Sequence, residues 1–84
     1  MIFVTVDNDS GSLRELSGRI FKKYPGSVVY EFTDPMMSVK YICNHDVDMV
    51  LAKEKMRPVN GTKFTDVVRV HKPTLPIIIL KEEK

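Results

Sequence analysis

The sequence contains a single cysteine, Cys43, and its apolar stretches are short. One cysteine excludes an intrachain disulfide framework and favours a reducing, cytoplasmic setting. A helix that spans a bilayer needs roughly 18–20 consecutive apolar residues, and since no stretch approaches that length, we expect no membrane segment. Met1 is followed at once by Ile2 and Phe3, without a basic start or a small-residue cleavage site, so we expect no signal peptide.

Neither sign of charge dominates the chain. Its 13 Lys and Arg and 11 Asp and Glu residues give a formal net charge of +2. This is too weak to indicate nucleic acid or an anionic membrane as the partner, and no basic patch interleaved with aromatic residues supports direct nucleic-acid binding. With 43% hydrophobic and 29% charged residues, the 84-residue chain has the composition of an ordinary globular protein. We expect one domain, residues 1–84, with a marginal core.

Apolar stretches typical of strands alternate with amphipathic stretches typical of helices. The predicted strands are 2–6, 27–32, 49–52 and 77–80, and the predicted helices are 13–24, 36–44 and 62–70. Asp9 or Ser10 is expected to cap the first helix, and Asp34 followed by Pro35 is a typical start for the second. Because the order βαβαβαβ requires right-handed crossovers, we predict an α/β fold with a mostly parallel sheet.

The stretch from Val47 to Gly61 is the centre of the pattern. Met49 to Ala52 is a short apolar run bounded by turn signals, as expected of a strand buried on both faces inside a parallel sheet. Open α/β sheets bind ligands outside the carboxyl ends of their strands. Lys53 is the first residue after the run, so we expect it at the rim of that crevice, at the start of a loop.

The chain resembles the receiver domain of bacterial response regulators along essentially its whole length. The resemblance rests on the order and spacing of several short segments. They are Val6-Asp7-Asn8-Asp9, Leu13-Arg14-Glu15-Leu16, Glu31-Phe32-Thr33-Asp34-Pro35, Asp48-Met49-Val50, Met56-Arg57-Pro58-Val59-Asn60-Gly61 and Leu75-Pro76-Ile77-Ile78-Ile79-Leu80. It implies the flavodoxin-like (CheY-like) three-layer sandwich, here truncated to four strands in the order 2-1-3-4. The family's fifth strand and two further helices would be missing.

The chain departs from the family pattern at the positions that carry its chemistry. In the family an acidic pair after the first strand binds Mg²⁺; the matching residues here are Asp7 and Asn8, with Asp9 beside them. Lys53 stands where the family has its phosphorylated aspartate, and Lys81 where it has a hydroxyl residue at the end of the fourth strand. An ammonium group cannot accept a phosphoryl group in this chemistry and would repel a divalent cation.

The resemblance with these departures predicts a pseudo-receiver. This would be a non-enzymatic signalling module that cannot be phosphorylated, has lost Mg²⁺ binding, uses no other cofactor and acts through protein–protein contacts. Lys53 either forms an ion pair with Asp7, Asp9 or both, which would fix one conformation, or points into solvent. In the second case Lys53 would have no effect, and even an ion pair at the surface contributes only about 0–1 kcal/mol. The sequence leaves both arrangements open.

A second hypothesis keeps the phosphorylation. The chain would be the N-terminal regulatory fragment of a longer response regulator, such as a transcription factor, and would accept the phosphoryl group on a substitute carboxylate. Glu54 and Asp48 are the candidates. Glu54 lies one position too late, and Asp48 begins the third strand at the far end of the sheet, so both are poorly placed.

The expected partner is a second copy of the chain. Without further strands, residues 77–80 would form an apolar edge strand, and part of one sheet face would lack a covering helix. Exposed apolar edges pair with other chains, so we predict a homodimer formed by edge pairing or by exchange of a terminal element. Neither nucleic acid nor a membrane is an expected partner. The charged end, Lys81 to Lys84, is expected to be solvated.

The remaining reactive residue types suit structural roles. His45 and His71 lie in different turns without partners at ligand spacing, so no metal site is predicted there. Cys43 has no evident base partner and is expected to be a small buried apolar side chain. Met36 and Met37 are expected to fill the core.

Overall fold

The computed structural model describes residues 1–81, which form a four-stranded sheet and three helices. In chain order the elements are β1 (Ile2–Val6), α1 (Ser10–Lys23), β2 (Val28–Phe32), α2 (Pro35–Asn44), β3 (Met49–Lys53), α3 (Gly61–His71) and β4 (Ile77–Leu80). All the predicted elements are confirmed. The largest boundary difference is at α1, which begins at Ser10 rather than Leu13. The predicted solvation of Glu82 to Lys84 concerns residues outside the described part.

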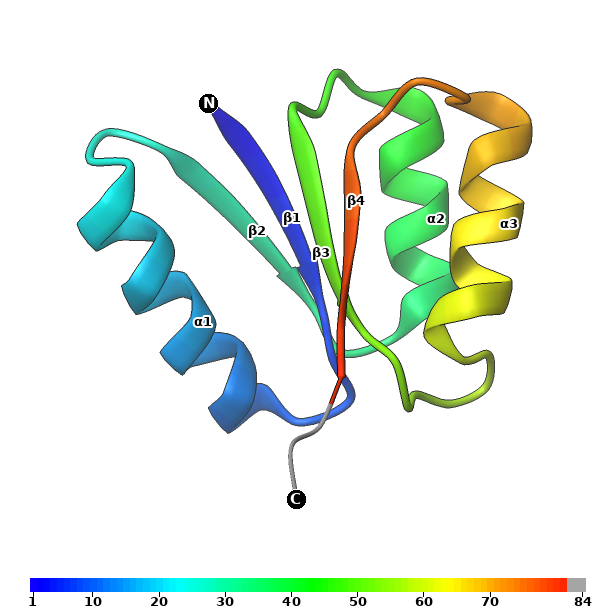
Figure 1. Cartoon of the computed structure of the whole chain (residues 1–84), viewed down its shortest axis with the longest axis horizontal. Coiled ribbons are helices and arrows are strands. Elements are labelled where there is room, and N and C mark those ends of the chain that lie inside the picture. Colours follow the sequence, from blue (N-terminus) through cyan, green and yellow to red (C-terminus); the bar gives the residue numbers. More distant parts are fainter. Residues whose placement is uncertain (82–84) are drawn as a thin grey trace.

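The sheet is entirely parallel, with strand order β2-β1-β3-β4, as predicted (Figure 1). In the register, Val6 lies opposite Phe32 on one side and Ala52 on the other, and Ala52 lies opposite Ile79. The four carboxyl ends therefore meet at one edge of the sheet, which is the lower edge in Figure 1.

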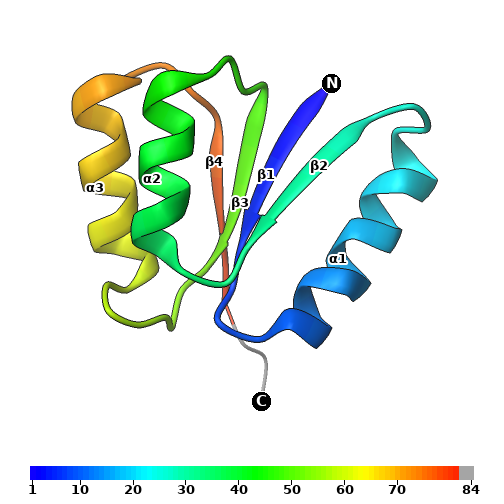
Figure 2. The same cartoon turned by 180° about the vertical axis from the view of Figure 1, so that it is seen from behind.

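The helices cover the two faces of the sheet unequally. Figures 1 and 2 show α1 on one face, beside β1 and β2, and α2 with α3 on the other. The main apolar core lies on the α2/α3 face. Its buried members are Val4, Val6, Ile42, Val50, Ala52, Met56, Phe64, Val68 and Leu75. On the other face, Leu13 and Ile20 of α1 are buried together with Phe3.

Each helix begins at a capping side chain. Asp9 accepts a hydrogen bond from the Gly11 N–H, Asp34 from the Met36 N–H and Asn60 from the Lys63 N–H. Such caps satisfy backbone donors that have no partner within the helix. The Asp9 alternative for the first helix and the Asp34-Pro35 start of the second are therefore confirmed.

The expectation for Met36 and Met37 was wrong. Both side chains are exposed, by 43% and 55% respectively. The buried stripe of α2 is made by Pro35, Ser38 and Ile42 instead. Ser38 tolerates burial because its hydroxyl donates to the Pro35 carbonyl at 2.6 Å. With a serine taking the inward position, the helical period turns the two methionines outward.

One further side chain differs from expectation. Cys43 is only half-buried. His45 is exposed but not free: its ring stacks on Tyr41 at 4.0 Å, and its Nδ1 lies 2.9 Å from the Tyr41 carbonyl oxygen. Burial, together with the neighbouring Tyr30, raises the pKa of the Tyr41 phenol. Among residues 1–81, no helix is long and apolar enough to cross a bilayer.

Candidate functional site

Lys53 and Asp7 face each other at the carboxyl edge of the sheet. Val6 lies opposite Ala52 in the β1–β3 register, so the residues that follow them, Asp7 and Lys53, lie at the same level at the carboxyl ends of the strands. Lys53 is the last residue of β3, and its Nζ lies 3.8 Å from the Asp7 Oδ2. The two side chains are 25% and 13% exposed. Of the arrangements that the sequence left open, the structure has the ion pair, and its partner is Asp7.

The two aspartates after β1 are each engaged by the backbone. Asp7 Oδ1 accepts a hydrogen bond from the Asp9 N–H at 3.0 Å, while the Asp7 N–H donates to the Phe32 carbonyl at 3.1 Å. Asp9 Oδ1 accepts from the Gly11 N–H at 2.9 Å. Asp7 therefore holds the turn after β1 as well as pairing with Lys53, and Asp9 is committed to the start of α1.

Asn8 connects three loops at this edge. Its side-chain Nδ2 donates to the Thr33 carbonyl at 2.8 Å and to the Arg57 carbonyl at 2.9 Å. Its Oδ1 accepts from the Arg57 N–H at 2.7 Å. Thr33 belongs to the β2–α2 loop, and Arg57 to the β3–α3 loop, where the Arg57–Pro58 peptide bond is cis. Sequence reasoning missed this role because it treated Asn8 only as a lost metal ligand.

The β3–α3 loop is held tightly against the strand that precedes it. The Gly61 N–H donates to the Glu54 carbonyl at 2.8 Å, and the Glu54 N–H donates to the Leu80 carbonyl at 2.9 Å. A Cβ atom on Gly61 would lie 2.7 Å from the Lys53 carbonyl oxygen, so only glycine fits here. The Asn60-Gly61 dipeptide is thus a helix cap followed by a close approach to β3.

Lys81 lies at the same edge of the sheet, directly after β4, and is exposed. A hollow of about 330 Å³ adjoins the clustered loops and is lined by Asn8, Lys55, Met56, Arg57 and Asn60. The carboxyl edge therefore gathers Asp7, Asn8, Lys53 and Lys81, with further cations around them. Among the described residues, no cluster of three His, Cys, Asp or Glu side chains could hold a metal ion.

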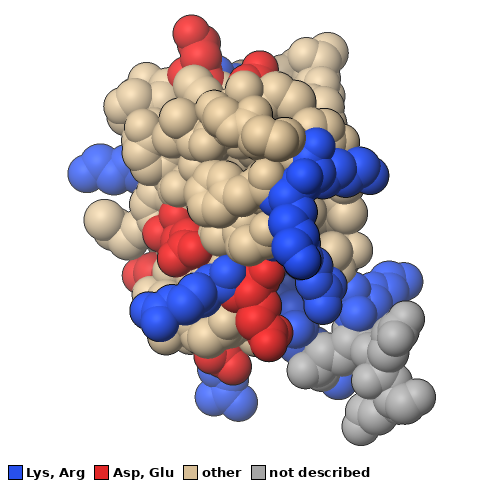
Figure 3. Space-filling model, turned by 90° about the vertical axis from the view of Figure 1, so that its left-hand side faces the viewer, with Lys and Arg blue, Asp and Glu red and all other residues tan. Residues whose placement is uncertain are grey.

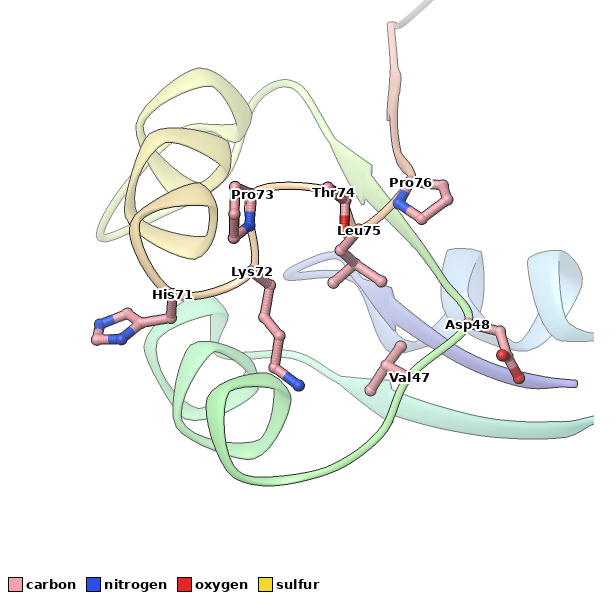
Figure 4. Close-up of a pocket in the computed structure, with 8 residues that line it drawn as sticks. All are labelled: Val47, Asp48, His71, Lys72, Pro73, Thr74, Leu75 and Pro76. Carbon is pink, nitrogen blue, oxygen red and sulfur yellow. The ribbon is translucent and has the colours of Figure 1, made fainter.

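A second hollow, of about 320 Å³, lies at the opposite edge of the sheet, where β3 and β4 begin (Figure 4). Lys72 crosses it, and its Nζ donates to the His45 carbonyl at 3.2 Å. Asp48 points away from it, and its Oδ2 accepts from the Ile2 N–H at 2.6 Å. Asp48, one of the substitute phosphoacceptors considered, is thus at the edge remote from Lys53, whereas Glu54 directly follows Lys53.

The side of the molecule formed by α1 and the β2 edge carries charges of both signs. Figure 3 shows acidic and basic side chains interspersed over its lower half, with further charged side chains at the top and at both sides of a broad uncharged surface. Exposed apolar residues at the end of α1 and on β2 include Phe21, Tyr24, Val28 and Tyr30. A surface with charges of both signs does not create the single-sign field that attracts nucleic acid.

Several solved structures superpose on this chain. An uncharacterised protein from Neptuniibacter caesariensis has a TM-score of 0.78 and 22% identity, and the match covers 86% of this chain and 52% of that one. The Francisella response regulator 1452 receiver domain has a TM-score of 0.82 and 16% identity over 95% and 64% of the two chains. For the Vibrio cholerae chemotaxis protein CheY4 the values are 0.83 and 20% over 99% and 69%. The chain thus spans about half to two thirds of the length of the first two.

Because the identities are low, the likeness to these structures shows only the fold. No curated protein matches the chain. Residues 3–84, however, match the family described as the response regulator receiver domain. That match covers nearly the whole chain and agrees with the strand order and with the acidic residues after β1. The chain belongs to the response regulator receiver domain family.

Proposed function

We propose that this receiver domain is a pseudo-receiver, a signalling module that receives no phosphoryl group and acts in the cytoplasm through protein–protein contacts. The observation that carries the proposal is the Lys53–Asp7 pair, with 3.8 Å between Nζ and Oδ2 at the carboxyl end of β3. Phosphoryl transfer requires a nucleophilic oxygen in line with the donor. A charged amine at that position supplies none. Receiver domains are in general signalling modules rather than enzymes.

The donor set also supports the loss of Mg²⁺ binding. Mg²⁺ requires near-octahedral oxygen ligands and is usually bound through one or two carboxylates. Here Asp7 has an ammonium beside one oxygen and a backbone donor on the other. Asn8 Oδ1 faces the Arg57 N–H, and the Asp9 carboxylate caps α1. These residues do not fit the metal, so no step of the proposed function passes through it.

A fixed site gives the module a constant shape instead of a switch. The Lys53–Asp7 pair joins the ends of the two central strands, β1 and β3, which is where a ligand would bind in an open α/β sheet. A cation that the chain itself supplies at this position favours one arrangement of the surrounding loops. The output of such a module would depend on which partner is present, and not on a chemical modification.

The proposed partner is a second copy of the chain, paired through β4. This strand lies at one edge of the sheet, and its apolar residue Ile78 is 44% exposed. Ile77 and Ile79 pack towards α2 and α3, so Ile78 lies on the face that α1 covers only beside β1 and β2. Parallel pairing would bring two Lys81 side chains together, so an antiparallel, two-fold arrangement is favoured.

Intact mass spectrometry after incubation with a small phosphodonor and Mg²⁺ tests the proposal. We expect the mass of the chain to remain unchanged under conditions that phosphorylate an ordinary receiver domain, which serves as the positive control. A stable phosphate adduct would overturn the proposal in favour of a substitute phosphoacceptor. The variants Glu54→Gln and Asp48→Asn, treated in parallel, would then identify the carboxylate that carries the adduct.

A further inference from the structure

The groups around Asn8 match a carboxamide and no other common side chain of its size. Two of them, the Thr33 and Arg57 carbonyl oxygens, require donors, and the third, the Arg57 N–H, requires an acceptor. A carboxamide supplies both, whereas an ionised carboxylate accepts only. We propose that Asn8 is a clamp, a neutral side chain that holds the three loops at the carboxyl edge of the sheet in one arrangement.

The clamp joins loops that are far apart in the sequence. Thr33 lies 25 residues from Asn8 in sequence, and Arg57 lies 49 residues away. The β1–α1, β2–α2 and β3–α3 loops thus meet at one side chain. Asn8 and Arg57 also line the hollow of about 330 Å³ at this edge. Asn8 therefore contributes to the shape of the surface that these loops present, a role that a lost metal ligand would not have.

An acidic residue at position 8 fits this arrangement less well than a carboxamide. The new carboxylate would lie against two carbonyl oxygens with no hydrogen to donate, beside Asp7 and Asp9, while the cations Lys55 and Arg57 line the same hollow and partly offset this effect. Protonation would restore one donor, so the pKa of the new carboxyl should be raised above its ordinary value of about 3.9. When the pKa of this carboxyl is higher in the folded state than in the unfolded state, the group's contribution to stability is greatest at low pH. That contribution is lost as the pH rises through the folded-state pKa.

Asn60 provides a matched control on the same edge. In the described part of the chain only its oxygen has a partner, the Lys63 N–H at 2.8 Å, in the cap of α3. Aspartate serves equally well at such a position, and its charge is favoured at a helix N-terminus. Asn60→Asp and Asn8→Asp make the same chemical change, yet the clamp predicts opposite dependences of stability on pH.

The experiment measures urea unfolding and amide hydrogen exchange for the parent, Asn8→Asp, Asn8→Ala and Asn60→Asp, at about pH 7 and about pH 4.5. Asn8 is exposed overall, so we expect a modest increase of the unfolding equilibrium constant, about tenfold for Asn8→Asp at about pH 7. The increase should shrink at about pH 4.5. Asn60→Asp should remain within about twofold of the parent at about pH 7 and become less stable, not more, at the lower pH.

Hydrogen exchange at Arg57 separates the clamp from a general loss of stability. Asn8→Ala should speed exchange of the Arg57 amide by more than its change in global stability allows, because the acceptor of this amide, the Asn8 Oδ1, is gone, whereas Asn8→Asp keeps an acceptor oxygen there. Equal stability and equal Arg57 exchange in the parent and the Asn8 variants would overturn the proposal. So would parallel pH dependences for Asn8→Asp and Asn60→Asp.

If an Asn8 variant fails to fold, the clamp can still be tested in the parent protein. Its Asn8 carboxamide hydrogens should exchange with solvent more slowly than those of Asn60, and equal rates would contradict the clamp. The clamp does not depend on whether the chain accepts a phosphoryl group. A phosphate adduct on the parent would overturn the pseudo-receiver and leave the clamp unaffected. Unchanged exchange of the Arg57 amide in Asn8→Ala would overturn the clamp and leave the pseudo-receiver unaffected.

Discussion

The Thr5 hydroxyl, in the middle of β1, is buried without a partner. The residue is fully buried, and its Oγ1 is the one buried side-chain oxygen or nitrogen in the described residues that makes no hydrogen bond. An unpaired buried hydroxyl costs about 1–3 kcal/mol. Thr5→Val keeps the shape and removes the group, so we expect the free energy of unfolding in urea to rise by about 1 kcal/mol.

Thr65 is the matched control for Thr5. Its hydroxyl donates to the Gly61 carbonyl at 2.8 Å, and the residue is half-buried in α3. Thr65→Val removes a hydrogen bond that exists, so it should lower the free energy of unfolding by up to about 1 kcal/mol. If Thr5→Val lowered the free energy of unfolding as much as Thr65→Val does, the Thr5 hydroxyl would have a partner in solution.

The Lys53–Asp7 pair should contribute little to stability although it decides the chemistry. Its separation of 3.8 Å and the 25% exposure of Lys53 place it nearer to a surface pair than to a buried one. A double-mutant cycle with Lys53→Met and Asp7→Asn should give a coupling energy of about 0.5–1 kcal/mol, and high salt should reduce it. Lys55→Met, at an exposed neighbouring lysine, should change stability by no more than about 0.5 kcal/mol. Zero coupling at low salt would show that the pair does not form.

At this scale the sequence predicts the position of a residue better than its partners. Lys53 could be placed at the carboxyl edge because an apolar run ends directly before it. Its pairing with Asp7 rather than Asp9 depends on strand register and on the Asp9 cap. The Asn8 bonds could not be foreseen at all, since their partners are backbone groups of distant loops. A backbone group has no signature in the sequence.

Two glycines show how differently one residue type serves two helices. Gly18 lies in α1, where a Cβ atom would meet nothing within 4 Å, so Gly18→Ala should stabilise the chain by about 0.5–1 kcal/mol. Gly61 begins α3, where a Cβ atom would lie 2.7 Å from the Lys53 carbonyl oxygen and 3.1 Å from the Glu54 Cα. Because both contacts are with backbone, Gly61→Ala should destabilise by about 1–3 kcal/mol.

Thermal or urea unfolding of the two variants checks this pair of predictions. A Gly61→Ala variant as stable as Gly18→Ala would mean that α3 approaches β3 less closely than the structure has it. Amide shifts of Lys53 and Glu54 provide an independent readout, because only the Gly61 change should move them.

The type and order of the elements were predictable because their signals are local. Apolar period, capping residues and proline act within a few positions, and the caps at Asp9 and Asp34 confirm this. The inward face of α2 was not predictable in the same way. Ser38 is buried while Met36 and Met37 are exposed, the reverse of their hydrophobicities, because the Pro35 carbonyl satisfies the serine hydroxyl. Residue polarity alone therefore misplaces a helix face when a local hydrogen bond compensates burial.

At the scale of the whole molecule, the two outer strands of the sheet, β2 and β4, differ in how they are protected. β2 contains Glu31, a charge within the strand, and its aromatic residues pack against α2 through contacts of Tyr30 and Phe32 with Tyr41. β4 has no charged residue, proline or interruption from Ile77 to Leu80. Unprotected edges of this kind promote association. The homodimer proposed above is thus expected to use β4 rather than β2.

Substitution of Ile78 tests the dimer and its location together. Size-exclusion chromatography with light scattering should give a dimer for the parent at micromolar concentration. Ile78→Lys should give a folded monomer, because a lysine at a 44% exposed position is tolerated in one chain but would repel its counterpart across a two-fold edge. Val70, on α3, is 77% exposed and offers the matched control, so Val70→Lys should leave the dimer intact. A parent that stays monomeric would exclude the dimer, whereas a dimer that survives Ile78→Lys would place the contact away from β4.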